Sequence, residues 1–335
     1  MVVSNTWAKL IKDYKKRGLV LALGAGVSKG CNLPNWEELL RRLAKESKLK
    51  GAASVFDELR TNGFTLPAIA SMLESDYKDD FSRAIKEALY QDFPFRNGID
   101  GNNQQDFIDF VRKNNSTLAS IAALCICKTD GSYEPNPRVH AIVNFNYDST
   151  FRAYVNVRYD KSDILRSIER PSATSIFGTI PVYYMHGFIR FDKDLGDLRH
   201  GAPDRRVLTE QEYFNFYNDP NGLFNYTFLY LLREHPCLFL GASMIDDNIR
   251  RLLHYSKKER EMGYIQEGRA DEAEEKSIRH YAVLKSPPSQ EIAGLTEISL
   301  KRLGVNVLWL NDFAEMPDLL AKVYESASGT WGDVN

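Results

Sequence analysis

The sequence predicts an α/β fold, with a Rossmann-like parallel sheet that carries helices on both faces and with a helical insertion. Short β-branched and aromatic runs alternate with stretches of helical spacing, which is typical of βαβ units. These runs are almost continuously hydrophobic, as expected for strands covered on both faces. Several of them end in glycines or polar residues, which favours a ligand site at the carboxyl edge of the sheet.

Six apolar runs are predicted as strands: Leu19–Leu23, Ala141–Phe145, Val182–Met185, Leu238–Leu240, Tyr281–Leu284 and Val305–Leu310. Between them, apolar residues at helical spacing predict helices over Pro34–Lys45, Ser149–Tyr159, Thr209–Tyr217, Leu223–Glu234, Asp246–Tyr255 and Met316–Ser326. The strongly charged segment Lys257–Lys276 is interpreted as a solvated helix or a mobile loop.

The interval between the first two strands is too long for a simple crossover. Five segments within it have helical spacing: Ala52–Arg60, Leu66–Leu73, Asp80–Tyr90, Gln105–Arg112 and Thr117–Cys127. Residues 50–135 are therefore expected to form a helical insertion, a small second lobe within one domain that spans residues 1–335.

Composition indicates an ordinary globular protein of 335 residues, 43% hydrophobic and 26% charged, with a net charge of −2. This near-neutral balance does not favour a nucleic-acid or membrane-surface binder. No run approaches the length of a transmembrane helix, and no signal-peptide pattern is present, so a cytoplasmic protein is expected. The four cysteines form no C-x-x-C pairs, so no zinc or other metal is predicted.

The glycine loop after the first strand, Gly24-Ala25-Gly26-Val27-Ser28, has two interpretations. Glycines at positions 24 and 26 permit a tight turn and let backbone N–H groups approach a pyrophosphate, to which Ser28 adds a hydroxyl. A short G-x-G is weak evidence alone, and a simple tight turn is an equal alternative.

The second strand runs into Asn144-Phe145-Asn146-Tyr147-Asp148. Polar residues at the end of a buried strand need hydrogen-bond partners. For Asp148 alone, capping of the helix that starts at Ser149 is the favoured interpretation. For Asn146 no capping role is evident, although an Asx-turn is a possible structural explanation. It is therefore the stronger candidate for a catalytic role.

His186 follows the third strand and precedes Gly187. An imidazole has an ordinary pKa of ~6.5 and suits a general base, although a hydrogen-bonded core histidine is the alternative. After the fourth strand, the turn Gly241-Ala242-Ser243 is expected to hold a phosphate or ribose oxygen. Asp246 follows that turn and serves either the same ligand or the next helix as its N-cap.

In these motifs the chain resembles the sirtuin fold, and specifically a divergent bacterial branch of sirtuin-like NAD hydrolases found in antiviral defence. The resemblance is carried by G-A-G-V-S at 24–28, N-F-N-Y-D at 144–148, H-G at 186–187 and G-A-S-M-I-D-D-N-I at 241–249. Residues 208–213 and the last strand, Gly304–Leu310, also look like that branch.

The resemblance implies a role for each motif residue. Asn146 and Asp148 would line the nicotinamide–ribose pocket, and His186 would act as general base. Cofactor binding would fall to Gly24, Ala25, Gly26, Ser28, Gly241, Ser243 and Asp246.

Two departures from deacetylating sirtuins affect the expected reaction. The four-cysteine zinc module is absent from the sequence, and Leu33–Trp36 stands where those enzymes have a loop ending in Asp-Phe-Arg. Phe145 also replaces their glutamine. Protein deacetylation is therefore disfavoured.

The predicted function is hydrolysis of NAD⁺ to nicotinamide and ADP-ribose, as the effector of an antiphage, abortive-infection system. The alternatives are a non-catalytic NAD or ADP-ribose sensor and an NAD-dependent deacylase or ADP-ribosyltransferase. Because unrestrained NAD hydrolysis would kill the host, the chain is expected to form a homo-oligomer and to need a separately encoded activator. The resemblance implies a hexameric DNA-translocase-like ATPase or another phage sensor as that partner.

Overall fold

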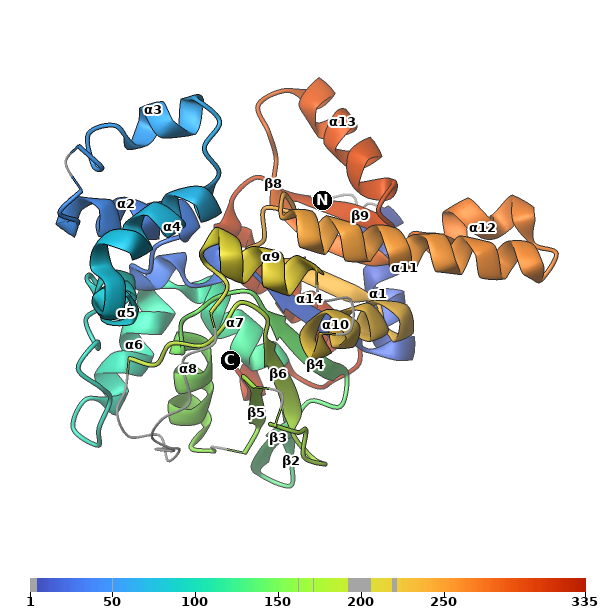
Figure 1. The fold of residues 1–335 in the computed structure, drawn as a ribbon. Coiled ribbons are helices and arrows are strands. Elements are labelled where there is room, and N and C mark those ends of the chain that lie inside the picture. The colour runs from blue at the N-terminus through green and yellow to red at the C-terminus, as the bar shows by residue number, and fades with distance from the viewer. Residues whose placement is uncertain (1–4, 50, 162, 171, 192–205, 219–221) are drawn as a thin grey trace.

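A seven-stranded parallel sheet forms the centre of the molecule (Figure 1). The computed structural model describes residues 5–49, 51–161, 163–170, 172–191, 206–218 and 222–335. The strand order is β5-β6-β4-β1-β7-β8-β9. Their bounds are Leu19–Leu23 for β1, Val139–Asn144 for β4, Leu165–Ile168 for β5, Ile180–Tyr184 for β6, Cys237–Leu240 for β7, His280–Lys285 for β8 and Val305–Leu310 for β9.

The central strand β1 shows how the sheet joins two layers of helices. All five of its residues are buried. Because successive strand side chains point to opposite faces, Leu19, Leu21 and Leu23 enter one hydrophobic cluster, while Val20 and Ala22 enter another. The first cluster holds buried residues of α1, α7, α8 and α14, and the second those of α10, α11 and α13.

The helices of the molecule lie close to predicted segments, except for those at 5–17 and 290–301, which were not predicted. Their bounds are α1 Asn5–Arg17, α2 Trp36–Glu46, α3 Phe56–Thr61, α4 Leu66–Tyr77, α5 Phe81–Tyr90, α6 Gln104–Asn114, α7 Ser116–Leu124, α8 Thr150–Tyr159, α9 Glu210–Asn218, α10 Leu223–Glu234, α11 Asp247–Gln266, α12 Ala270–Ser277, α13 Gln290–Lys301 and α14 Met316–Glu325. The α/β fold class with helices on both faces is confirmed.

Some local predictions were wrong. The helix predicted over Thr117–Cys127 ends at Leu124, and a two-stranded antiparallel hairpin, β2 (Ile126–Thr129) and β3 (Ser132–Pro135), follows it. Residues 118–124 are all buried, so hydrophobicity gives no sign of where the helix stops. The edge strand β5 was missed, because Arg166 and Ser167 interrupt its apolar character.

The charged segment 257–276 is helical, the first of its two interpretations. It contains the end of α11 and most of α12, which project together from the body of the molecule (Figure 1). Its few apolar residues give little to bury, and helical hydrogen bonds satisfy its backbone.

Helices α3–α7 occupy the segment that was expected to be an insertion. In Figure 1, α2 to α5 gather beside one end of the sheet. Their buried residues belong to the same hydrophobic cluster as one face of β1. Helix α4 also contacts α9, which follows the third of the predicted site motifs.

The order of the strands along the chain reverses direction at β1. Strands β4, β5 and β6 lie on one side of β1, and β7, β8 and β9 lie on the other. Such a switch point leaves a crevice at the carboxyl ends of the strands, where α/β proteins bind ligands. The loops after β1, β4, β6 and β7 all start at this edge.

Candidate functional site

The glycine loop after β1 lies directly against the turn after β7. Gly24 donates its N–H to the Leu240 carbonyl at 2.9 Å, and Gly26 donates to the Gly241 carbonyl at 2.9 Å. A Cβ on Gly24 would stand 2.6 Å from the Gly241 oxygen, and one on Gly241 would stand 2.5 Å from the Val27 nitrogen. Glycines are therefore required here for contact between two backbones.

This packing limits what the loop offers a phosphate. The N–H groups of Gly24 and Gly26 are engaged with the β7 side, and those of Val27 and Ser28 donate within the loop itself. Within the described part of the chain, that leaves the N–H of Ala25, a half-buried residue, without an intramolecular acceptor. An oxyanion at this loop would meet Ala25 first.

A chain of hydrogen bonds joins this loop to the end of β4. Asn146 Nδ2 donates to the Gly24 carbonyl at 3.0 Å and approaches Ser28 Oγ at 3.4 Å. Ser28 Oγ in turn donates to Asp148 Oδ2 at 2.8 Å. All three side chains are buried. The structure thus brings together three of the residues singled out from the sequence.

The Asn146 side chain has one unused hydrogen-bonding atom. Its Nδ2 faces a carbonyl oxygen, which fixes the amide orientation and leaves Oδ1 as the remaining acceptor. Among the described residues, no group donates to this oxygen, although it is buried. A buried acceptor without a partner costs free energy, about 1–3 kcal/mol, which binding of a ligand hydroxyl or water would relieve.

Asp148 performs the structural role considered for it and also belongs to the hydrogen-bond chain. Its Oδ1 accepts from the backbone N–H of Thr150, the first residue of α8, at 3.0 Å. Burial raises the pKa of this carboxyl, although the hydrogen bonds from Ser28 and Thr150 oppose that shift. The buried position of Asp148 therefore makes its charged form costly in free energy.

The substitution Asp148→Asn is expected to stabilise the protein at neutral pH, since Asn retains an acceptor for Thr150 and a polar contact to Ser28. The folded pKa of Asp148 lies above its ordinary value of 3.8. Wild-type stability from this group is full below pH 3.8 and falls as pH rises through the folded pKa. Urea unfolding from pH 3.5 to 7.5 should show the variant's advantage growing with pH. A constant difference across that range would contradict this assignment.

His186 lies beyond the end of β6, within an aromatic enclosure. It is 8% exposed, and its ring lies 5.5 Å from that of Phe145, 5.9 Å from that of Phe216 and 6.5 Å from that of Tyr147. Its carbonyl accepts from the N–H of Val207 at 2.8 Å, which ties the segment before α9 to this strand end. These walls limit water around the imidazole.

The turn after β7 completes the edge. Gly241 has φ of +63°, a left-handed conformation suited to glycine, and Ser243 is exposed. Asp246 is the N-cap of α11 and accepts from the Ile249 N–H at 2.9 Å. The N-cap alternative for Asp246 is therefore confirmed.

Several site residues lie on helices, where reasoning from strand ends does not reach. The ring of Trp36, at the start of α2, lies 6.5 Å from that of Tyr213 on α9. Phe216, also on α9, forms one wall beside His186. Tyr147 Oη donates to the Val207 carbonyl at 2.6 Å. In the sequence, Tyr147 lies in the N-F-N-Y-D motif and Tyr213 in the family-like segment at 208–213, whereas Phe216 lies in none of the motifs.

Within the part of the chain that the structure describes, no three His, Cys, Asp or Glu residues gather in a way that could hold a metal ion. In the same residues, no helix is long and apolar enough to cross a bilayer.

The fold defines a Rossmann-like α/β protein, with a candidate ligand site at the switch point of its sheet. The model of the SIR2-like domain family matches residues 140–307, half of the 335-residue chain. The chain therefore belongs to the SIR2-like domain family, which confirms the sirtuin-like resemblance and identifies an NAD-dependent class of enzyme. No curated protein matches the sequence.

The matched region contains Asn146, Asp148, His186 and Gly241, while the glycine loop at 24–28 precedes it. The loop is joined to the matched region by the hydrogen bonds from Asn146 and to Gly241. An NAD molecule fits the chemistry of this edge, because Asn146 Oδ1 and the Ala25 N–H offer an acceptor and a donor for hydroxyl and phosphate groups.

Proposed function

We propose that this protein hydrolyses NAD⁺ to nicotinamide and ADP-ribose at the carboxyl edge of its sheet. The observation that supports the proposal is the buried Asn146 amide, which is anchored through Nδ2 and presents Oδ1 without a partner among the described residues. An acceptor held in one orientation positions a water or ribose hydroxyl without reorganisation during the reaction.

His186 and Asp148 supply the other two catalytic roles. Cleavage of the N-glycosidic bond builds positive charge on the ribose, and a water must then lose a proton. His186 accepts that proton, a contribution of about 10²–10⁴-fold for a placed general base. Asp148, buried and bonded to Ser28, contributes negative charge beside Asn146.

The cofactor-binding residues surround these three. The Ala25 N–H meets a phosphate, while Gly24, Gly26 and Gly241 keep the two loops close enough to form the edge. Ser28 holds Asp148, and the exposed Ser243 and the carboxylate of Asp246 serve the adenosine side.

In its biological setting, we propose an effector of antiphage defence that acts by depleting NAD⁺. Such an enzyme needs restraint, so the chain acts as a homo-oligomer under the control of a separately encoded activator, with the helical insertion at 50–135 as its accessory region. A hexameric DNA-translocase-like ATPase or another phage sensor is the proposed partner. Light scattering on the purified protein tests the assembly: a monomer with full activity would contradict it.

The test of the activity is chromatography of nicotinamide and ADP-ribose released from NAD⁺, with the activator added where the isolated chain is silent. Wild type should release both products in equal amounts, and His186→Gln should be slower by about 10²-fold or more. His254→Gln, on exposed surface of α11, is the matched control and should retain full activity.

Two outcomes would redirect the proposal. Calorimetric binding of NAD⁺ without turnover under every activating condition would favour the sensor alternative. Transfer of ADP-ribose to a protein, or loss of acyl groups from one, would appear by mass spectrometry and favour the protein-modifying alternatives.

A further inference from the structure

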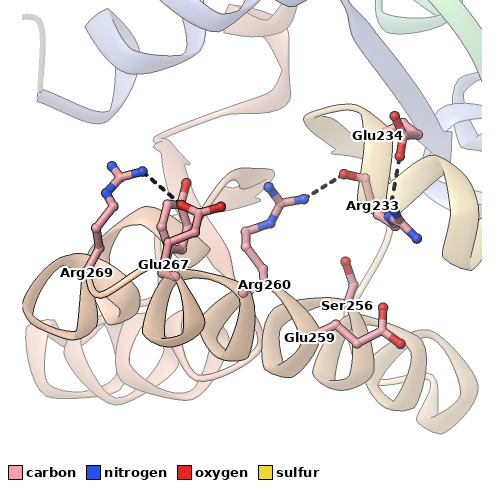
Figure 2. A pocket seen from close by; sticks show the side chains of 9 residues that line it. Arg233, Glu234, Ser256, Glu259, Arg260, Glu267 and Arg269 are labelled. Carbon is pink, nitrogen blue, oxygen red and sulfur yellow. Dashed lines mark hydrogen bonds and ion pairs between the residues drawn. The ribbon is translucent and has the colours of Figure 1, made fainter.

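A second polar pocket lies at the opposite end of the sheet from the candidate NAD site. It opens where α10 ends and β7 begins, beside the part of α11 that returns toward the amino ends of the strands (Figure 2). Its volume is about 530 Å³, within the range of small-molecule sites. The residues that line it are Arg233, Glu234, Ser256, Glu259, Arg260, Gly263, Tyr264, Glu267 and Arg269.

Two guanidinium groups converge on one carbonyl oxygen at this pocket. Arg260 Nη2 donates to the Arg233 carbonyl at 2.6 Å, and Arg279 Nη1 donates to the same oxygen at 2.7 Å. Arg279 Nη2 also donates to the Glu234 carbonyl at 2.8 Å. These are the last carbonyls of α10, whose dipole supplies about half a negative charge. Two full positive charges are therefore only partly compensated.

Glu234 acts on both arginines, and Asp13 on Arg279, only from a distance. Among the described residues, no carboxylate lies within 4.0 Å of the guanidinium nitrogens of Arg260 or Arg279. Burial lowers the pKa of Arg260, with Arg17 adding to the shift and Tyr264 and Glu234 opposing it. Burial, and then the charges of Arg260 and Arg17, lower the pKa of Arg279 to about 10. Burial and the charges of Arg279 and Arg260 also lower the pKa of His280. The charges of Arg17, Arg260 and Arg279 therefore gather beside this pocket, opposed by those of Glu234 and Asp13.

The pocket also contains a buried hydroxyl without a partner. Ser256 on α11 is 3% exposed, and its Oγ has no hydrogen-bond partner among the described residues. Most buried hydroxyls are hydrogen-bonded, so an unpaired one that lines a polar pocket points to a missing ligand or water. This observation is independent of the arginine charges.

The pocket lining contains three arginines and three glutamates, and four of these six residues form two ion pairs. Figure 2 shows Arg260 reaching toward the Arg233 carbonyl, with the Arg233–Glu234 pair at one end of the pocket and the Arg269–Glu267 pair at the other. Their N···O distances are 3.5 and 3.3 Å. Glu259 is exposed. In Figure 2, Arg260 lies between the two ion pairs, and Ser256 lies beside Glu259 on the same helix.

We propose that this pocket binds the phosphate group of a small molecule of nucleotide size, with Arg260 and Ser256 Oγ as its central contacts. A guanidinium and a hydroxyl are matched donors for phosphate oxygens. The Tyr264 ring forms a flat part of the pocket wall. The Cζ atom of Arg269 lies 4.8 Å from the centre of this ring. The site is separate from the candidate NAD site and does not depend on NAD hydrolysis.

The test is calorimetric titration of the full-length protein with pyrophosphate, and with inorganic phosphate, at constant ionic strength. Wild type should show saturable binding. Arg260→Gln should weaken it by about 10-fold or more, the usual effect of losing a hydrogen bond to a charged group. Ser256→Ala should weaken it several-fold, and Arg260→Lys should restore part of it.

Lys258→Gln is the matched control, because Lys258 is exposed on the same helix and does not line the pocket. It should bind as wild type does. Thermal unfolding without anion checks that the variants fold; if Arg260→Gln does not, Ser256→Ala decides the matter because it removes only a hydroxyl. No saturable binding in wild type, or equal binding in wild type and the folded variants, would overturn the proposal.

Discussion

Asn146→Ala is expected to lower the rate of NAD⁺ hydrolysis by about 10²–10³-fold, the usual effect of removing one preorganised polar group from a reaction centre. The affinity for NAD⁺ should change little, because the loop and turn backbones that meet the phosphates are kept. A fall in kcat with nearly constant dissociation constant, measured by chromatography and calorimetry, is the expected pattern.

The same substitution should leave the protein folded. Asn146 donates to the Gly24 carbonyl, but that oxygen also accepts from the Val27 N–H at 3.0 Å and keeps a partner in the variant. The unpaired Oδ1 is removed together with the side chain, which relieves a desolvation cost. The net loss of stability should be about 1 kcal/mol or less.

A matched control is Asn136→Ala. Asn136 is also buried, but its side chain is fully used: Nδ2 donates to Tyr14 Oη and the Leu124 carbonyl, and Oδ1 accepts from the Arg138 N–H. This variant should be the less stable of the two and yet retain activity in its folded fraction. If Asn146→Ala instead turned over NAD⁺ like wild type, Asn146 would have no part in the chemistry.

The sequence predicted six of the seven sheet strands, because their hydrophobic runs reflect burial on both faces, but it missed the edge strand β5. The predicted strands β1 and β9 match their observed bounds, and the other four differ by one or two residues at an end. The end of α7 was mispredicted because residues on every face of this helix are buried, so the sequence shows no helical periodicity. Nothing in the sequence therefore marked where the hairpin after it begins.

The candidate site, like the fold, was predicted only in part. Positions at strand ends follow from topology, so Asn146, Ser28 and Asp148 were found to lie together. The direction of an amide and the identity of an unpaired oxygen depend on distances between loops, which no periodicity encodes. Phe216 was not predicted because it approaches His186 from α9 and not from a strand end.

The close contact of the two loops predicts a large effect at Gly241. Gly241→Ala is expected to destabilise the protein by about 2–5 kcal/mol. A left-handed backbone disfavours a Cβ by about 1–2 kcal/mol, and overpacking against rigid backbone adds about 1–3 kcal/mol. The added Cβ would lie 2.5 Å from the Val27 nitrogen and 2.9 Å from the Gly26 carbonyl carbon, atoms that no side-chain rotation can move.

Gly268→Ala separates these two causes. Gly268 also has a left-handed backbone, with φ of +76° against +63° at Gly241, but nothing lies within 4 Å of the added Cβ. It should therefore lose only the conformational part, about 1–2 kcal/mol, and retain NAD⁺ turnover. Chemical denaturation of both variants measures the difference, which is the free energy of the loop contact. Equal destabilisation of the two variants would mean that the loops after β1 and β7 shift readily to accommodate a Cβ. A larger loss of stability in Gly241→Ala, together with lost NAD⁺ turnover, would mean that turnover requires the close contact between the two backbones.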